Sequence, residues 1–255
     1  MIKILSGVLA ILSFFAPKST VNAWASFNES DGVYDRVQID ERVIALTFDD
    51  GPHPYLTPEI LEILDDFDAK ATFFVVGSMA RLYPATLKAV SDAGHEIGNH
   101  TYTHLMESNG GCEKLKKEII DTEQAILEIA LQKSTLFRPP TGYICKNAVK
   151  MTGELGYKTI VWDIDTKDWA HNSPQKILAE VKKYAKNGSI ILFHDFIGTN
   201  SPTPAALRLV LPYLKEQGYR FVTVSEMLNL KYLDRTVQKQ HSPLLFSTSL
   251  SAFLL

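Results

Sequence analysis

Residues 43–52 read VIALTFDDGP, an apolar β-rich run that ends in two adjacent carboxylates, Asp49 and Asp50. Further β-rich runs follow and alternate with amphipathic helical stretches. The seven expected strands cover residues 43–48, 71–76, 95–98, 135–138, 159–163, 189–194 and 220–224. The expected helices cover residues 58–67, 84–93, 113–131, 148–155, 174–185 and 204–216, the first with Thr57 as its cap. Repeated strand–helix units form a parallel sheet with helices outside it.

Seven parallel strands can close into an incomplete barrel. The sequence therefore predicts an α/β fold, a distorted (β/α)7 barrel in a single domain, with a doubly wound open sheet as the alternative. The chain has 255 residues, of which 45% are hydrophobic, which is enough for one substantial core. We expect a catalytic domain over residues 42–230, an N-terminal extension over 26–41 and a C-terminal tail over 231–255.

The first 25 residues have the three parts of a secretory signal peptide. Lys3 supplies a positive charge, residues 4–16 are mostly apolar, and small residues recur before Ala23 and Ala25, where cleavage is expected. The alternative is an uncleaved anchor. The apolar run is shorter than the roughly 20 residues of a membrane span. The sequence therefore predicts a secreted or periplasmic protein without an integral membrane span after signal removal.

Charge and cysteine usage narrow the function classes. The net charge is −3 and no basic stripe stands out, so we expect no nucleic-acid partner. We also expect the protein to be a monomer. The two cysteines, Cys112 and Cys145, can pair in an oxidising compartment, but two thiols fit the sequence equally well. They form no C-x-x-C metal motif.

Unusual polar residues collect where the expected strands end. In a parallel barrel, catalytic groups lie at the carboxyl ends of strands and in the loops that follow. The residues at these positions are Asp49, Asp50, His100, His104, Arg138, Asp165, Asp168, Trp169 and His194. Their shared position predicts a catalytic site at this end of the barrel.

The pair His100-x-x-x-His104 indicates a metal site. On a helical turn, residues four apart share one face, and two imidazoles with a carboxylate suit zinc or a similar transition metal. Two solvated histidines are the alternative. Asp49 and Asp50 would repel each other unless a cation offsets their charge. One of them can face the ion and leave the other as a base, although an acidic turn before Gly51 would have the same sequence.

Three more residues have two interpretations each. Arg138 can make a forked contact with a carboxylate, or it is an arginine in a surface turn. Trp169 can form a wall of a sugar site, or it belongs to the core. His194 is well placed as a general acid, or it is a hydrogen-bonded structural histidine.

Together these residues resemble the polysaccharide deacetylase family, the fourth family of carbohydrate esterases, over residues 42–228. The five motifs that carry the resemblance occur in order as TFDD (47–50), HTYTH (100–104), RPP (138–140), DTKDW (165–169) and LFH (192–194). The resemblance implies a distorted barrel enzyme. Such enzymes remove N-acetyl groups from chitin-like sugars or peptidoglycan, or O-acetyl groups from xylan.

The resemblance also implies a role for each motif residue. Asp49 would be the catalytic base, oriented by Arg138, and His194 the catalytic acid, tuned by Asp168. The metal ligands would be Asp50, His100 and His104, holding a divalent ion, Zn2+ first and Co2+ or another transition metal as alternatives. Trp169 and Leu192 would line the acetyl pocket. Thr141 departs from the family, which usually has an aromatic residue here; its N–H can still support the oxyanion, but the aromatic wall is lost.

We therefore expect a metal-dependent hydrolase that removes N-acetyl groups from an acetylated carbohydrate. An O-acetyl esterase of the xylan type, or a small-amide hydrolase, would use the same site. A catalytically retired carbohydrate-binding protein is a further alternative. Such a chain typically loses an acid or a ligand, whereas the base, the acid and all three ligand positions remain here.

Overall fold

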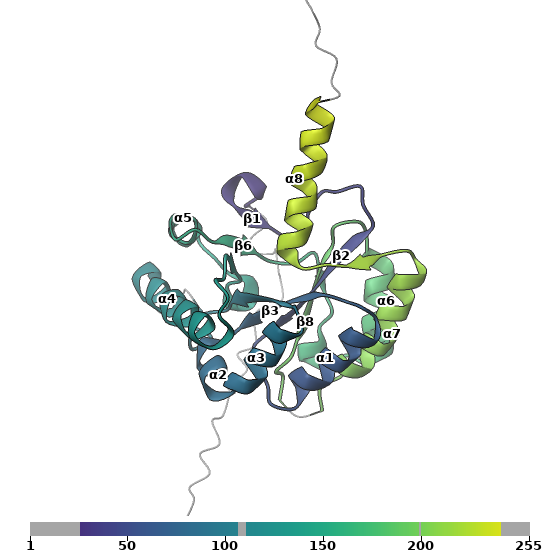
Figure 1. Cartoon of the computed structure of the whole chain (residues 1–255), viewed down its shortest axis with the longest axis horizontal. Helices are drawn as coiled ribbons and strands as arrows, with labels where there is room; N and C mark the ends of the chain where they lie inside the picture. The colour runs from purple at the N-terminus through teal and green to yellow at the C-terminus, as the bar shows by residue number, and fades with distance from the viewer. Residues whose placement is uncertain (1–25, 107–110, 199, 241–255) are drawn as a thin grey trace, which may run out of the picture.

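A computed structural model describes residues 26–106, 111–198 and 200–240, with side chains as far as residue 233. The expected signal peptide, residues 1–25, and the apolar end of the tail, residues 241–255, lie outside the described residues. A curled parallel sheet occupies the centre, with α4 and α5 on one side and α6 and α7 on the other (Figure 1).

All strand pairs of the main sheet are parallel, in the order β1-β6-β5-β4-β3-β2-β8-β7, and β9 pairs with β2. The strands are β1 Val33–Tyr34, β2 Val43–Asp49, β3 Ala71–Val75, β4 Glu96–Asn99, β5 Leu136–Phe137, β6 Lys158–Ile160, β7 Ile164–Asp165, β8 Ile190–His194 and β9 Arg220–Phe221. The helices are α1 Leu56–Asp66, α2 Gly77–Leu82, α3 Pro84–Asp92, α4 Gly111–Ala130, α5 Lys146–Glu154, α6 Pro174–Tyr184, α7 Thr203–Glu216 and α8 Val224–Gln240, with short 3-10 turns η1 Glu29–Asp31, η3 Pro140–Gly142 and η4 Asp168–Ala170.

The central strand β2 shows how the sheet closes. Alternate residues of a strand point to opposite faces. Ile44, Leu46 and Phe48 belong to the hydrophobic cluster that the outer helices cover. Val43 and Ala45 belong to a second cluster inside the curl, which α8 also joins through Val224, Met227 and Leu228. The sheet therefore has a helix-covered outer face and a packed interior, and the expected single-domain distorted (β/α)7 barrel is confirmed over the doubly wound alternative.

Four elements differ from the expectation. The strands β1 and β7 have only two residues each, too few to leave a periodic pattern, and the six-residue α2 begins with a glycine. α8 crosses the expected domain end at residue 230. The segment 26–41, expected as an extension, contributes β1 to the sheet. Thr57, expected as the cap of α1, lies inside that helix, and its hydroxyl donates to Asp195.

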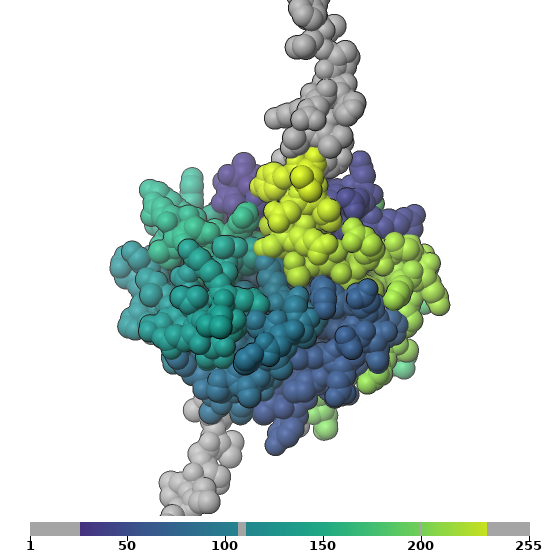
Figure 2. Space-filling model, in the orientation of Figure 1, coloured from purple at the N-terminus to yellow at the C-terminus, as the bar shows by residue number. Residues whose placement is uncertain are grey.

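The N-terminal turn η1 and the helix α8 meet on the surface. In the space-filling view α8, in yellow, stands beside purple N-terminal residues (Figure 2). Lys231 of α8 is buried and pairs with Glu29 of η1. Over residues 26–106, 111–198 and 200–240, none of the helices has both the length and the apolar character that crossing a membrane requires.

Candidate active site

Asp49 and Asp50 leave β2 in different directions. Asp49 is the last residue of the strand and is 3% exposed, and its side chain points into the barrel like that of Thr47. An extended continuation would turn Asp50 to the outer face. Instead Asp50 has φ of 78°, a left-handed conformation that is rare for a residue other than glycine. This turn brings both carboxylates to the same end of the barrel.

Asp50 lies against both histidines of the H-x-x-x-H pair. Its Oδ1 is 3.1 Å from Nε2 of His104 and 3.4 Å from Nε2 of His100. One ligand atom from each of the three residues lies within 4.8 Å of the others. Burial favours the neutral form of Asp50, but the two histidines outweigh it and hold the pKa of Asp50 well below its usual value. Asp50 is therefore an anion facing two imidazoles.

The three residues fit a divalent cation. Oδ1 of Asp50 is buried and makes no hydrogen bond with any described residue, although an unpaired buried carboxylate oxygen is costly. Zinc ligands lie about 2.0–2.1 Å from the ion, so two ligand atoms of a tetrahedral site are about 3.3 Å apart. The two Asp50–histidine distances bracket this value. An Asp-His-His donor set also suits zinc-type ions, with open positions left for water or substrate.

The loop that carries the histidines is not the helical turn that the spacing predicted. Residues 100–104 have no helical assignment, and Thr101 and His104 both have positive φ, 66° and 57°. Glu118 of α4 holds the loop by accepting hydrogen bonds from the backbone N–H groups of Tyr102 at 2.8 Å and Thr103 at 2.6 Å. The expectation of a shared helix face was wrong, but the two imidazoles still converge.

Asp49 is fixed by a fully buried arginine. Nη1 of Arg138 donates to Oδ1 of Asp49 at 2.7 Å and to Oγ1 of Thr47 at 2.8 Å. Its other nitrogens donate to the carbonyl oxygens of Ile160 and Val161, at 3.2 and 3.0 Å. Burial lowers the pKa of Arg138, although Asp49 opposes this. Arg138 is thus a barrel-interior group that orients Asp49, not an arginine in a surface turn.

His194 ends β8 and is held by Asp168 of η4. Nδ1 of His194 lies 2.8 Å from Oδ1 of Asp168, and Oδ2 accepts from the backbone N–H of His194 at 2.8 Å. Oδ2 also accepts from the hydroxyl of Thr203 at 2.7 Å. Burial disfavours the charged imidazole, but Asp168, Asp50 and Asp49 together raise the pKa of His194 to about 10. A cation beside Asp50 would oppose this rise in pKa, because a nearby positive charge disfavours protonation of the His194 imidazole.

The remaining motif residues surround this arrangement. Thr141 lies in η3 directly after β5, is exposed, and has φ of 63°. Trp169 lies in η4 and is 53% exposed, so it is not a core residue, and its Nε1 donates to Oδ1 of Asp165 at 3.2 Å. Leu192 is buried on β8, paired with Thr47 on one side and Asp165 on the other. All three lie at or near the carboxyl ends of strands.

Two hydroxyl groups, those of Thr47 and Thr203, contact the site residues and had no role assigned from the sequence. Thr47 bridges Arg138 and the carbonyl of Ile191, and Thr203 completes the shell of Asp168. Thr47 lies within a quoted motif, and its alternation with Asp49 signals an inward side chain. Thr203 begins α7, 35 residues after Asp168, and the sequence carries no signal for their contact.

The two cysteines lie at the starts of neighbouring helices. Cys112 is in the first turn of α4, and Cys145 precedes α5. Both side chains are half-buried against the same hydrophobic cluster. A disulfide and two separate thiols stay equal alternatives for this pair of residues.

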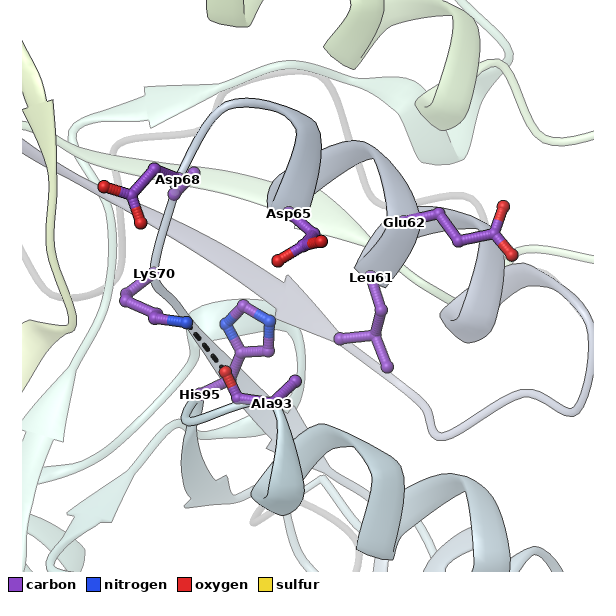
Figure 3. A pocket seen from close by; sticks show the side chains of 8 residues that line it. Leu61, Glu62, Asp65, Asp68, Lys70, Ala93 and His95 are labelled. Carbon is purple, nitrogen blue, oxygen red and sulfur yellow. Dashed lines mark hydrogen bonds between the residues drawn. The ribbon is translucent and has the colours of Figure 1, made fainter.

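A shallow pocket of about 340 Å3 lies at the opposite end of the barrel (Figure 3). It is lined by residues of α1, of the following loop and of the turn before β4. His95 at its floor is buried, and its Nδ1 accepts from the backbone N–H of Ala71 at 3.2 Å. Burial lowers the pKa of His95 to about 4. His95 is thus a neutral structural histidine away from the strand ends that carry the candidate site.

Comparisons with known proteins agree with this geometry. The sequence model of the family described as polysaccharide deacetylase matches residues 36–160. A peptidoglycan-N-acetylglucosamine deacetylase of Bacillus cereus is 46% identical over 195 residues, which cover 76% of this chain and 91% of the relative. A chitooligosaccharide deacetylase of Azorhizobium caulinodans is 32% identical over 196 residues, which cover 72% of this chain and 93% of that relative.

A solved structure extends the likeness to three dimensions. The crystal structure of the Bc1960 peptidoglycan N-acetylglucosamine deacetylase matches with a TM-score of 0.76 at 35% identity, covering 78% of this chain and 94% of that chain. The likeness thus extends to the barrel fold. The expected resemblance is confirmed: this chain belongs to the polysaccharide deacetylase family.

Proposed function

We propose that this protein is a metal-dependent hydrolase that removes N-acetyl groups from amino sugars of peptidoglycan or of a chitin-like polysaccharide. The observation that carries the proposal is the Asp50-His100-His104 cluster. Beside it, Asp49, paired with Arg138, and His194, paired with Asp168, end the neighbouring strands β2 and β8. The names of the relatives from Bacillus cereus and Azorhizobium caulinodans support the two substrate classes.

Asp50, His100 and His104 would hold the cation, which when bound supplies Lewis acidity to a water and to the acetyl carbonyl oxygen. The role of Asp49 is that of general base. One of its oxygens is engaged by Arg138, and the other, Oδ2, lies 3.8 Å from Nε2 of His100, on the side of the metal ligands. Asp49 thereby receives a proton from the attacking water.

His194 acts as the general acid. Asp168 engages Nδ1, which leaves Nε2 to donate a proton to the nitrogen that leaves the acetyl carbon. The amide C–N bond breaks, and acetate and a free amino sugar result. The backbone N–H of Thr141 supports the negative carbonyl oxygen, an interaction of a kind worth about 3 kcal/mol. Trp169 and Leu192 line the space for the acetyl methyl group.

Zinc is the ion we propose, because two imidazoles and one carboxylate suit borderline transition metals. Co2+ would fit the same donors. Metal analysis of the purified protein tests this assignment. Chelation should abolish acetate release, and Zn2+ or Co2+ should restore it.

Acetate release tests the reaction itself. The purified enzyme should release acetate from peptidoglycan or from chitooligosaccharides, and less from acetylated xylan. Acetate from xylan alone would indicate an O-acetyl esterase. A metal-loaded protein that binds these glycans and releases no acetate from any of them would be the retired binding protein, and would overturn the proposal.

We further propose that the protein acts outside the cytosol as a monomer, with a catalytic domain over residues 42–230 that β1 and α8 extend. The proposed export rests on Lys3, the apolar residues 4–16 and the small residues before Ala25. Mass spectrometry of the exported protein should find a new N-terminus after Ala23 or Ala25. Light scattering of the purified protein should give the mass of one chain.

A further inference from the structure

Asp195 is a buried carboxylate beside the candidate site that the proposed mechanism does not use. It follows His194 directly and is 1% exposed. Its backbone N–H donates to the carbonyl of Asp49 at 3.1 Å. Oδ2 accepts from the hydroxyl of Thr57 at 2.6 Å, whereas Oδ1 makes no hydrogen bond with any described residue. Burying a carboxylate with one unpaired oxygen costs free energy, which indicates that the contacts of Asp195 serve the neighbouring site.

The carboxylate of Asp195 packs directly against Gly51, the residue after Asp50. A Cβ atom on Gly51 would lie 2.1–2.3 Å from the three carboxyl atoms, closer than any side chain can approach. The backbone N–H of Gly51 also interacts with this carboxylate. On the other side, the carbonyl of Gly51 accepts from the N–H of Val76 at 2.9 Å. Gly51 is therefore held from two directions.

Thr57 connects this contact to the rest of the loop. It is fully buried in the first turn of α1, and its Oγ1 accepts from the backbone N–H of His53 at 2.8 Å while donating to Asp195. His53 Nδ1 accepts from the N–H of Leu56 at 3.0 Å, and its ring stacks on Phe196. The segment from Asp50 to His53 is thus fastened to the residues that follow β8.

We propose that Asp195 and Thr57 are positioning residues that hold the Asp50–His53 turn, and through it aim Oδ1 of Asp50 at His100 and His104. The left-handed backbone of Asp50 is a conformation that persists only where surrounding contacts impose it. The next residue, Gly51, is held by contacts with Asp195 and Val76. This inference rests on the proposed metal site, because it assigns Asp50 a ligand geometry to maintain.

Metal affinity tests the inference without relying on turnover. Thr57→Val removes the hydroxyl at nearly constant volume, and Thr57→Ser retains it. Asp195→Asn replaces one oxygen by a donor, which then faces either the Thr57 hydroxyl or the Gly51 N–H. Thr152→Val is the matched control, because Thr152 is also a fully buried helical threonine, in α5, bonded to Val149 and close to Thr159.

Zn2+ affinity would be measured on each full-length variant by competition with a chelating dye, together with the visible spectrum of the Co2+ form. Groups that orient metal ligands typically contribute about 10- to 100-fold in metal affinity. We expect Thr57→Val and Asp195→Asn to weaken Zn2+ binding by about this factor and to alter the Co2+ spectrum. Thr57→Ser and Thr152→Val should match the wild type in both.

Each other result has a definite meaning. Wild-type affinity and spectrum in folded Thr57→Val and Asp195→Asn would overturn the inference while leaving the metal site intact. Equal weakening in Thr152→Val would also overturn it, because the effect would then be one of general packing. A wild-type protein that binds neither Zn2+ nor Co2+ would instead overturn the proposed function. Thermal unfolding of each apo variant identifies any that fail to fold. If Thr57→Val fails, the comparison of Asp195→Asn with Thr57→Ser decides. If Asp195→Asn fails, the comparison of Thr57→Val with Thr57→Ser decides.

Discussion

The carbonyl oxygen of Arg138 lies 2.7 Å from Nδ1 of His100, while the guanidinium of the same arginine donates to Asp49. A carbonyl can only accept, so Nδ1 of His100 carries the proton and Nε2 is left as the metal-binding atom. One residue thus sets the tautomer of a candidate ligand and the orientation of the candidate base.

Arg138→Met should strongly destabilise the fold. The variant leaves Asp49 buried without its cation, and breaking a buried pair from one side costs about 3–5 kcal/mol. Denaturant unfolding would measure the loss. Arg208→Met, which breaks an exposed pair with Asp66, should change stability little. Equal stability of the two variants would contradict the role assigned to Arg138.

Asp49→Asn should lose activity and keep its metal. An amide cannot accept the proton of the attacking water, and general-base contributions are typically about 100- to 10,000-fold. Acetate release and metal content would be measured on the same sample. Asp66→Asn, at an exposed position, serves as the control. Near wild-type turnover in Asp49→Asn would remove Asp49 as the base.

His104→Ala should lose the metal and the activity together. We expect Zn2+ binding to weaken by more than about 100-fold, beyond what ligand-orienting groups contribute. His171→Asn is a suitable control, because His171 is an exposed residue with positive φ, which asparagine tolerates. Full metal occupancy in His104→Ala would exclude His104 as a ligand.

Asp168→Asn should shift the pH dependence of catalysis. Asp168 is the chief group that raises the pKa of His194 against burial. Without this anion the imidazole loses its proton at lower pH, so the alkaline limb of kcat/KM should move down by about one pH unit or more. A pH–rate profile measures the shift. An unmoved alkaline limb would show that His194 is not the acid.

Asp163→Asn should remove part of the pH dependence of stability. Burial raises the pKa of Asp163 from 3.8 to about 6, although Ser189, Ile190 and Lys186 oppose the rise. The folded state therefore holds a proton that the unfolded state releases, and this stabilisation, present below pH 3.8, is lost as the pH rises to about 6. The contribution is about 3 kcal/mol. Unfolding free energies of both proteins between pH 3.5 and 7 would reveal it, and parallel curves would contradict it.

The sequence was sufficient for the barrel, and the motif residues that it singled out lie together at one end of that barrel. Strands such as β2 and β8 are buried apolar runs that end in a polar motif, and this pattern can be recognised in the sequence alone. Prediction failed where a local pattern is absent. β1 and β7 have only two residues each, and the first turn of α8 packs into the barrel interior instead of lying on the surface as an amphipathic helix.

The geometry of the site was harder to predict from the sequence. The spacing of His100 and His104 suggested a helix, but Glu118 from α4 imposes a loop with left-handed residues instead. Thr57 has the sequence context of a helix cap, and only the folded chain shows its partner, Asp195. Such hydroxyl–carboxylate contacts depend on tertiary proximity, which neither propensity nor periodicity encodes.

The pairing of β2 with β8 has a consequence for how the enzyme matures. The bonds that tie Thr47 to Ile191 and Thr57 to Asp195 join residues 144 and 138 positions apart. Loops of this length close late in folding, because closing them costs conformational entropy before the contacts that they allow can stabilise the chain. A chain that is synthesised from its N-terminus would therefore have no activity until β8 has been synthesised and has paired with β2. In refolding experiments, acetate release should return no sooner than the docking of β8, because His194 ends this strand.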